Sequence, residues 1–242
     1  MEEKCRFTSR LPIEKNEGWQ SLSQRQLLMD LFKIPFIANN FWLAGGTCLS
    51  AMYLGHRQSE DLDLFTTLKT IHPSERETIV DILPDVLGQK RELGFSTEIN
   101  SIFASLIINN TKVDFVADRF AYECERPTIL LDNVACKIDS WDNLCVAKFS
   151  AFLSRTSDKD ISDIGAILKT ANNDMEFKQI TDFLICETRK RDAMADELSQ
   201  VADIILYASE KSESQPYKDI LIKFAETVIG FTKEIAEGFE MP

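Results

Sequence analysis

One stretch, residues 41–66 (FWLAGGTCLSAMYLGHRQSEDLDLFT), constrains the fold of this chain more than any other. Its pattern predicts a short apolar strand, a Gly-Gly turn, a helix over residues 47–54, a loop and a second strand. A strand–helix–strand unit of this kind indicates an α/β structure. It also brings a glycine turn and an acidic strand into one local unit.

The acidic strand carries two carboxylates at alternate positions. Asp61 and Asp63 alternate with Leu62 and Leu64. Because successive side chains of a strand point to opposite faces, both acids share one face, and both leucines share the other. Two residues of rise separate the acids by roughly 6.6 Å along the strand, which suits shared divalent ions. Taken alone, such a strand is more often a solvated face, so the metal hypothesis depends on its neighbours.

Three further features favour a metal and phosphate site. The turn Gly45-Gly46-Thr47 enters a helix whose first N–H groups are free, which is a favourable place for phosphate. Asp114 lies within the apolar segment TKVDFVA, where a charge is costly unless it is paired or metal-bound. Lys and Arg also recur further along at helical spacing. Three converging carboxylates repel each other, and oxygen ligands favour Mg²⁺ or Mn²⁺ over zinc.

Polar residues around the glycine turn extend the candidate site. Glycines lack the Cβ that would hold a phosphate away from the backbone, and Thr47 adds a hydroxyl donor. Arg57 and Ser59 precede the acids, where Arg57 has the charge to contact a triphosphate. A solvated surface arginine fits this position too. For His56 the surface interpretation is preferred.

A second polar set lies in the predicted helices after residue 139. Lys148 and Arg155 are two helical turns apart on one face, and Asp160 and Asp163 share a face of the next helix. Two interpretations stay open. The acids favour the helix dipole and pair locally, or Lys148 contacts phosphates while an acid orients it.

The remaining pattern divides the chain into an α/β part, residues 1–138, and a helical domain, residues 139–242. The first part is expected to hold helices over 21–37 and 73–92. It also holds a hairpin of strands 101–108 and 111–117 around Asn109-Asn110, and an apolar stretch over 128–138. The second is expected to hold helices only: 140–155, one that Ser157 and Asp160 open as a capping pair, 175–186, 192–208 and 216–236.

Composition disfavours several classes of protein. The chain has 242 residues, 44% of them hydrophobic, and 27 basic against 39 acidic residues give a net charge of −12. A general nucleic-acid binder is disfavoured because phosphate neutralisation needs clustered Lys and Arg, whereas small substrates or a basic protein partner fit. The N-terminus lacks a signal-peptide pattern, and no apolar run has membrane-spanning length. The six cysteines have no regular spacing, so they are expected to be thiols in a reducing cytoplasm. The protein is not expected to bind a membrane.

Three motifs in order resemble a known family. They are GGT followed by HRQSEDLDLF within residues 41–66, KVDFV at 112–116, and Lys148 and Arg155 followed by KDISD at 159–163. Together they resemble the AbiEii/AbiGii toxin group of nucleotidyltransferases, within the polymerase-β-like superfamily. The resemblance covers about residues 40–170. It implies a mixed sheet with flanking helices, followed by a C-terminal helical bundle.

The resemblance also implies an activity. A nucleoside monophosphate would pass from an NTP to an acceptor hydroxyl, on tRNA or protein, with pyrophosphate leaving. Asp61 and Asp63 would hold two Mg²⁺ (or Mn²⁺) ions, and Asp114 would share one and help deprotonate the acceptor. Lys148 would neutralise the triphosphate and complete the catalytic set. The nucleotide-binding set would be Gly45, Gly46, Thr47, Arg57, Ser59, Lys148, Arg155, Asp160 and Asp163.

Members of this group act as toxins of bacterial toxin–antitoxin or abortive-infection systems, so an antitoxin protein is an implied partner. Two departures are visible: Thr47 stands where the wider superfamily often has serine, and 14 residues separate Gly46 from Asp61. Two alternatives remain beside the toxin. One is a catalytically silent scaffold or regulatory protein. The other is an enzyme that adenylates a small cationic molecule such as an aminoglycoside, which the acidic charge would attract.

Overall fold

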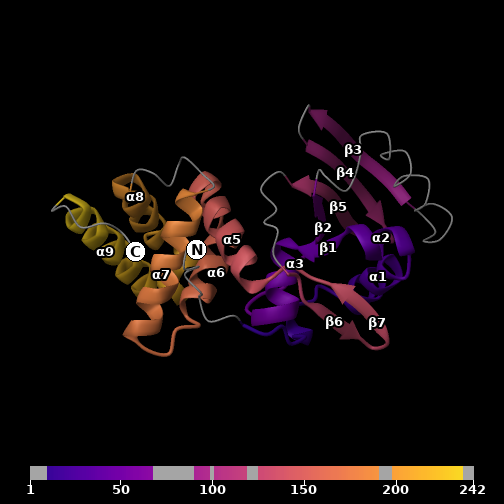
Figure 1. Cartoon of the computed structure of the whole chain (residues 1–242), viewed down its shortest axis with the longest axis horizontal. Helices are drawn as coiled ribbons and strands as arrows, with labels where there is room; N and C mark the ends of the chain where they lie inside the picture. Colours follow the sequence, from indigo (N-terminus) through magenta and orange to yellow (C-terminus); the bar gives the residue numbers. More distant parts are fainter. Residues whose placement is uncertain (1–9, 68–89, 99–100, 119–124, 191–197, 237–242) are drawn as a thin grey trace. The chain divides into compact units, whose positions relative to one another are not determined.

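The computed structural model describes residues 10–67, 90–98, 101–118, 125–190 and 198–236. These residues form two compact units, one ending at Trp141 and the other beginning at Asp142. All described strands belong to the first unit, and the second contains only helices among its described residues (Figure 1). The predicted α/β class with a mixed sheet and flanking helices is confirmed. The domain bounds 1–138 and 139–242 stay a prediction.

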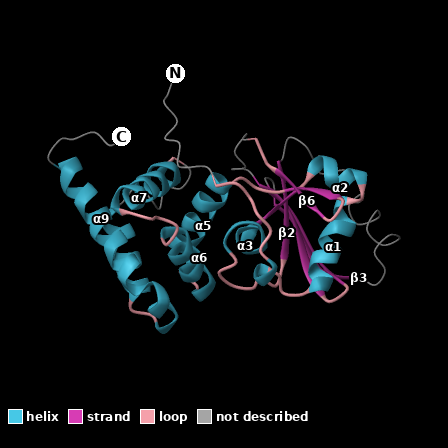
Figure 2. Cartoon of the chain, turned by 90° about the horizontal axis from the view of Figure 1, so that it is seen from below, coloured by secondary structure: helices cyan, strands magenta, loops and turns pink. Residues whose placement is uncertain are grey.

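A five-stranded mixed sheet forms the centre of the first unit. Its order is β1-β2-β5-β4-β3, with helices α1, α2 and α3 flanking it (Figure 2). Only the β2–β5 pair is parallel; the three other neighbouring pairs are antiparallel. The strands are β1 (Trp42–Ala44), β2 (Leu62–Thr67), β3 (Lys90–Glu98), β4 (Ser101–Ile108) and β5 (Thr111–Asp118).

The β4–β5 hairpin confirms the predicted Asn-Asn turn. Asn109 and Asn110 have φ values of 48° and 65°, the left-handed values that a two-residue hairpin turn of type I′ requires. Asparagine tolerates this region better than most residues do. The turn sets the register, in which Ser105 lies opposite Asp114 and Leu106 lies opposite Val113. One local turn therefore decides which side chains of β4 face the third carboxylate.

The helix predicted over residues 21–37 is wrong as a single helix. The structure has α1 (Leu22–Phe32) and α2 (Pro35–Asn40), separated by Lys33 and an extended Ile34. Proline disfavours the α conformation of the residue before it and suits the first helical position, so it ends one helix and starts the next.

The glycine turn opens the predicted helix over residues 47–54 two residues early. It consists of α3 (Gly45–Leu49) and a π-helical turn over Ser50–Leu54. Gly55 ends it with φ 66°, the left-handed cap that glycine supplies most easily.

Two further predictions for the first unit have mixed outcomes. The helix predicted over 73–92 lies mostly outside the described residues, but its last residues, 90–92, belong to β3, so that end is wrong. The apolar stretch 128–138 forms a separate hairpin of β6 (Thr128–Leu131) and β7 (Val134–Lys137), turning at Asp132 with φ 51°.

The second unit is a helical bundle. Aromatic side chains form part of its core: Phe149 and Phe224 have ring centroids 5.4 Å apart, and Phe149 also stacks on Phe152. No helix in the described ranges is long and apolar enough to cross a membrane. The elements are α5 (Trp141–Arg155), α6 (Asp158–Leu168), α7 (Asp174–Arg189), α8 (Leu198–Ser209), a 3₁₀ turn (Ser212–Tyr217) and α9 (Lys218–Ala236).

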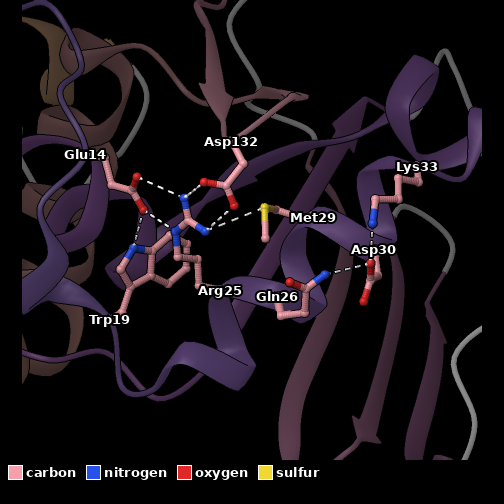
Figure 3. A network of polar contacts seen from close by, with 8 residues as sticks. All are labelled: Glu14, Trp19, Arg25, Gln26, Met29, Asp30, Lys33 and Asp132. Carbon is pink, nitrogen blue, oxygen red and sulfur yellow. Dashed lines mark hydrogen bonds and ion pairs between the residues drawn. The ribbon is translucent and has the colours of Figure 1, made fainter.

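A polar network ties three segments of the first unit together (Figure 3). Arg25 of α1 donates to both oxygens of Glu14, at 2.6 and 3.2 Å, and to both oxygens of Asp132, at 2.9 and 3.2 Å. Trp19 Nε1 also donates to Glu14, at 3.0 Å. The hydrogen bonds and charges of Glu14 and Asp132 raise the pKa of Arg25, so the guanidinium stays charged. Arg25 thus connects the N-terminal segment, α1 and the β6–β7 turn.

Replacing Arg25 with methionine is expected to lower the free energy of unfolding by roughly 1 kcal/mol, because two bidentate ion pairs are lost. The matched control is Lys33→Met, drawn in the same network, whose side chain is 57% exposed and pairs only locally with Asp30. Its effect is expected near zero. Urea denaturation measures both variants, and equal losses would show that Arg25 does not join the three segments.

Candidate functional site

The glycine turn packs directly against the acidic strand. Gly45 has φ 66°, and a Cβ built on it would overlap the Asp63 carboxylate. A Cβ on Gly46 would lie 2.8 Å from Ser59 Oγ and 2.9 Å from a guanidinium nitrogen of Arg57. Only glycine leaves room for these side chains. The structure therefore brings four of the predicted nucleotide-binding residues to the side of Asp63.

Thr47 fixes the first acid of the strand. Its buried hydroxyl donates to the backbone carbonyl of Asp61, in the residue just before β2. This bond ties the start of α3 to the start of the acidic strand. In the structure the Thr47 hydroxyl therefore positions Asp61, a role that the sequence analysis did not assign to it.

The loop between the helix and the acids is held from α1. Gln24, a buried residue, donates from Nε2 to the backbone carbonyl of Ser59 at 2.9 Å. Trp19 forms a backbone bridge with Ser59 as well. The loop that carries Arg57 and Ser59 is thus anchored to a structural helix. Sequence reasoning missed Gln24, because its partner lies 35 residues away and no local pattern points to it.

Two of the three predicted carboxylates lie on adjacent strands, and Asp61 immediately precedes one of these strands. Asp63 of β2 is the register partner of Asp114 of β5 in the parallel pair, and neighbouring strands lie about 4.8 Å apart. Asp61 lies two residues before Asp63 and alternates with the fully buried Leu62. Asp114 is 7% exposed. Asp63 and Asp114 therefore lie side by side on two inner strands of the sheet, and Asp63 is also beside the glycine turn.

Lys112 lies among these carboxylates. Its Nζ is 2.5 Å from Asp114 Oδ2 and 3.9 Å from Asp61 Oδ2. Burial lowers its pKa, but the hydrogen bond to Asp114 and the charges of Asp114, Asp61 and Asp63 outweigh this, so the pKa is raised. The ammonium therefore stays protonated and neutralises part of the negative charge. The sequence already indicated that Lys112 lies near Asp114, because the two residues share a strand face.

The donor set fits Mg²⁺ or Mn²⁺, since all three candidate ligands are carboxylates and hard cations prefer oxygen. Among the residues that the structure describes, no group of three His, Cys, Asp or Glu side chains is arranged as a metal centre. The Lys112 ammonium instead contacts two of the acids. Binding of metal by Asp61, Asp63 and Asp114 stays a prediction.

In the second unit Lys148 and Asp163 form a buried ion pair. Lys148 Nζ of α5 lies 2.8 Å from Asp163 Oδ2 of α6, and the two side chains are 10% and 0% exposed. A pair this deeply buried orients the lysine and links the two helices. This geometry agrees with the interpretation in which an acid orients Lys148.

Arg155 and Asp160 form a different pair at the start of α6. Two guanidinium nitrogens of Arg155 donate to the two carboxylate oxygens of Asp160, both at 2.8 Å. Ser157 caps the helix by accepting from the Asp160 backbone N–H, and Asp160 accepts from the Ser157 N–H in return. The predicted capping pair is confirmed. The four predicted residues after residue 139 thus form two separate pairs. Asp163 orients Lys148, whereas Arg155 and Asp160 pair at the start of α6.

The capping pair has a consequence for pH. Burial raises the pKa of Asp160, but hydrogen bonds from Arg155 and Ser157 outweigh it, so the pKa is lowered overall. A carboxyl with a lowered folded-state pKa stabilises the protein above its ordinary pKa of about 4, and this is lost as pH falls through the folded-state pKa.

Asp160→Asn is therefore expected to lower the free energy of unfolding at pH 7 and to weaken its decline in acid. Urea titrations between pH 7 and pH 3 measure both effects. Asp158→Asn is the matched control, an exposed acid in the same helical turn. An Asp160 variant with an unchanged acid decline would contradict the capping account.

Solved structures with similar folds include one nucleotidyltransferase toxin. MenT4, a nucleotidyltransferase toxin from Mycobacterium tuberculosis, has 13% identity and a TM-score of 0.54, with 86% of this chain and 82% of that chain covered. JHP933 from Helicobacter pylori has 13% identity and a TM-score of 0.48, with 93% and 96% covered. A search of the curated proteins found no match. At this identity the MenT4 likeness shows the fold.

The family of this chain is shown by its match to a protein-family model, whereas the structural likeness shows only the fold. The model described as "Nucleotidyl transferase AbiEii toxin, Type IV TA system" matches residues 26–228. This range contains the glycine turn, the three acids with Lys112, and both downstream pairs. The expected resemblance is confirmed over more of the chain than the three motifs cover. The chain belongs to the AbiEii family of nucleotidyltransferase toxins.

Proposed function

We propose that this nucleotidyltransferase moves a nucleoside monophosphate from an NTP to an acceptor hydroxyl in a Mg²⁺-dependent reaction, with pyrophosphate leaving. The observation that carries the proposal is the contact between the glycine turn and the acids. Gly45 packs against the carboxylate of Asp63, which pairs in register with Asp114. A phosphate bound along the turn would therefore lie beside the predicted metal ligands.

The following site residues of the first unit have proposed tasks. The backbone of Gly45 and Gly46 accommodates the triphosphate, and the Arg57 guanidinium beside Gly46 binds its oxygens. Asp61 and Asp63 would hold the metal, and Asp114 would share it and help to take the proton from the acceptor hydroxyl. When bound, the metal ions stabilise charge on the attacking and leaving oxygens of the in-line displacement.

In the second unit, Lys148 stays a predicted phosphate ligand. Its ammonium is oriented by Asp163 at 2.8 Å and remains 10% exposed. Arg155 and Asp160 pair with each other, which supports a role in starting α6. Binding of the nucleotide by Arg155, Asp160 or Asp163 stays a prediction.

The family supports the biological part of the proposal. A Type IV toxin–antitoxin model matches the chain, so we propose that it acts as a bacterial toxin with an antitoxin partner. We also propose a cytoplasmic location, which is consistent with a toxin–antitoxin family. The acceptor is tRNA, a protein or a small molecule. The net charge of −12 makes a cationic acceptor a real competitor of tRNA.

Thermal stability with each of the four NTPs, with and without Mg²⁺, tests the donor. A ligand at a hundredfold excess over its Kd stabilises the native state by about 2.7 kcal/mol, which gives a clear shift in Tm. We expect a Mg²⁺-dependent shift with at least one NTP. The absence of any shift would favour a silent scaffold. A shift with an aminoglycoside would favour the small-molecule acceptor.

A further inference from the structure

A serine on the strand next to β5 contacts the third carboxylate directly. Ser105 of β4 is the register partner of Asp114, and its Oγ donates to Asp114 Oδ1 at 2.5 Å. Both side chains are buried, with residue exposures of 5% and 7%. A charge-assisted bond at this depth is stronger than an exposed one and fixes the geometry of its acceptor.

The two oxygens of Asp114 have different partners. Oδ1 accepts from Ser105 Oγ, and Oδ2 lies 2.5 Å from the Lys112 ammonium. The strand neighbours Val113 and Phe115 are buried and apolar, so they offer the carboxylate no side-chain hydrogen bond. Ser105 and Lys112 together therefore fix how the carboxylate plane is turned. With Oδ1 held, Oδ2 is the oxygen that faces a cation.

We infer that Ser105 is a positioning residue for the metal site, an inference that rests on the proposed function. Its hydroxyl holds Oδ1 of Asp114, so that Oδ2, the oxygen that contacts the Lys112 ammonium, is the one presented to a divalent cation. The serine acts through Asp114. Hydrogen bonds of this kind to a ligating carboxylate typically change metal affinity 10–100-fold when they are removed.

Three variants test the inference. Ser105→Ala removes the hydroxyl, and Ser105→Thr keeps a hydroxyl in a residue that suits a strand. Thr66→Val is the matched control. Thr66 lies on β2 with a buried hydroxyl that has no hydrogen-bond partner in the described part of the chain, on the strand face opposite Asp63. Thermal melts of all three, measured without metal, show whether they fold.

Binding of Mn²⁺ alone, followed by the electron paramagnetic resonance signal of the free ion, gives the readout. We expect Ser105→Ala to raise the Kd for Mn²⁺ about tenfold, with Ser105→Thr within about threefold of wild type and Thr66→Val unchanged. If Ser105→Ala does not fold, Ser105→Thr must still bind Mn²⁺ like the wild type, and failure to do so overturns the inference.

A failure of the Ser105 inference can be distinguished from a failure of the proposed metal site. If wild type binds Mn²⁺ tightly and Ser105→Ala binds it equally well, the inference is overturned and the proposed function stands. If wild type binds Mn²⁺ no better than Asp63→Asn, the metal site itself is overturned, and the inference goes with it.

Discussion

Replacing Asp63 with asparagine is expected to abolish Mg²⁺-dependent NTP binding and to lower nucleotidyl transfer at least about a thousandfold. Asp63 follows Asp61 by two residues and is the register partner of Asp114, and the glycine turn packs on its carboxylate. Metal ions contribute several kcal/mol of transition-state stabilisation, and each 1.4 kcal/mol is about tenfold in rate. Asparagine keeps the shape of the side chain but loses the charge that holds the metal.

The fold should survive this change, because Asp63 lies on the more exposed face of β2 and asparagine is isosteric. Isothermal titration with Mg²⁺ and the NTP measures binding, and circular dichroism checks the fold. Asp30→Asn is the control, since Asp30 is an acid of α1 that pairs with Lys33 away from the site (Figure 3). A folded Asp63→Asn protein with wild-type affinity for Mg²⁺ and NTP would refute the metal assignment.

The second large effect is expected from Lys148→Met. Asp163 is completely buried and lies 2.8 Å from the Lys148 ammonium, so the variant removes the positive charge beside a buried carboxylate. Breaking one partner of such a pair costs about 3–5 kcal/mol, because the remaining charge is costly in an apolar environment. We therefore expect the free energy of unfolding to fall by about 3 kcal/mol, and activity to fall with it.

A double-mutant cycle separates these two consequences. In Lys148→Met/Asp163→Leu no buried charge of the pair remains, so much of the stability should return while phosphate binding stays lost. Urea denaturation gives the stabilities, and the KM for NTP gives the binding. Recovery of both stability and KM in the double variant would mean that Lys148 acts only in the structure.

Local patterns predicted part of the local geometry. The Asn-Asn hairpin depends on residues close in sequence and appears as expected, whereas both glycines already belong to α3 and Asp61 lies one residue before β2. The start of α6 was predictable for the same reason, because Ser157 and Asp160 are three residues apart. The break at Pro35 was also readable, since a proline disfavours the helical conformation of the residue before it.

Contacts between distant segments were harder to predict. The pairing of Asp63 with Asp114 depends on the parallel β2–β5 neighbours, which no local pattern specifies. Gln24 reaches Ser59 across 35 positions for a similar reason. Ser105 is different: a two-residue turn at Asn109-Asn110 already implies that Ser105 faces Asp114. The contact of Ser105 with Asp114 was not predicted, because the register that this turn sets was not used to pair the residues of the two strands.

The most direct test of the account is transfer of label from an NTP to an acceptor. The protein is incubated with Mg²⁺, a candidate acceptor and NTP labelled at either the α- or the γ-phosphate. If a nucleoside monophosphate is transferred, the α-label should appear on the acceptor and the γ-label in pyrophosphate, and neither should move in Asp63→Asn. Appearance of the γ-label on the acceptor, or equal α-label transfer by Asp63→Asn, would contradict the proposed reaction.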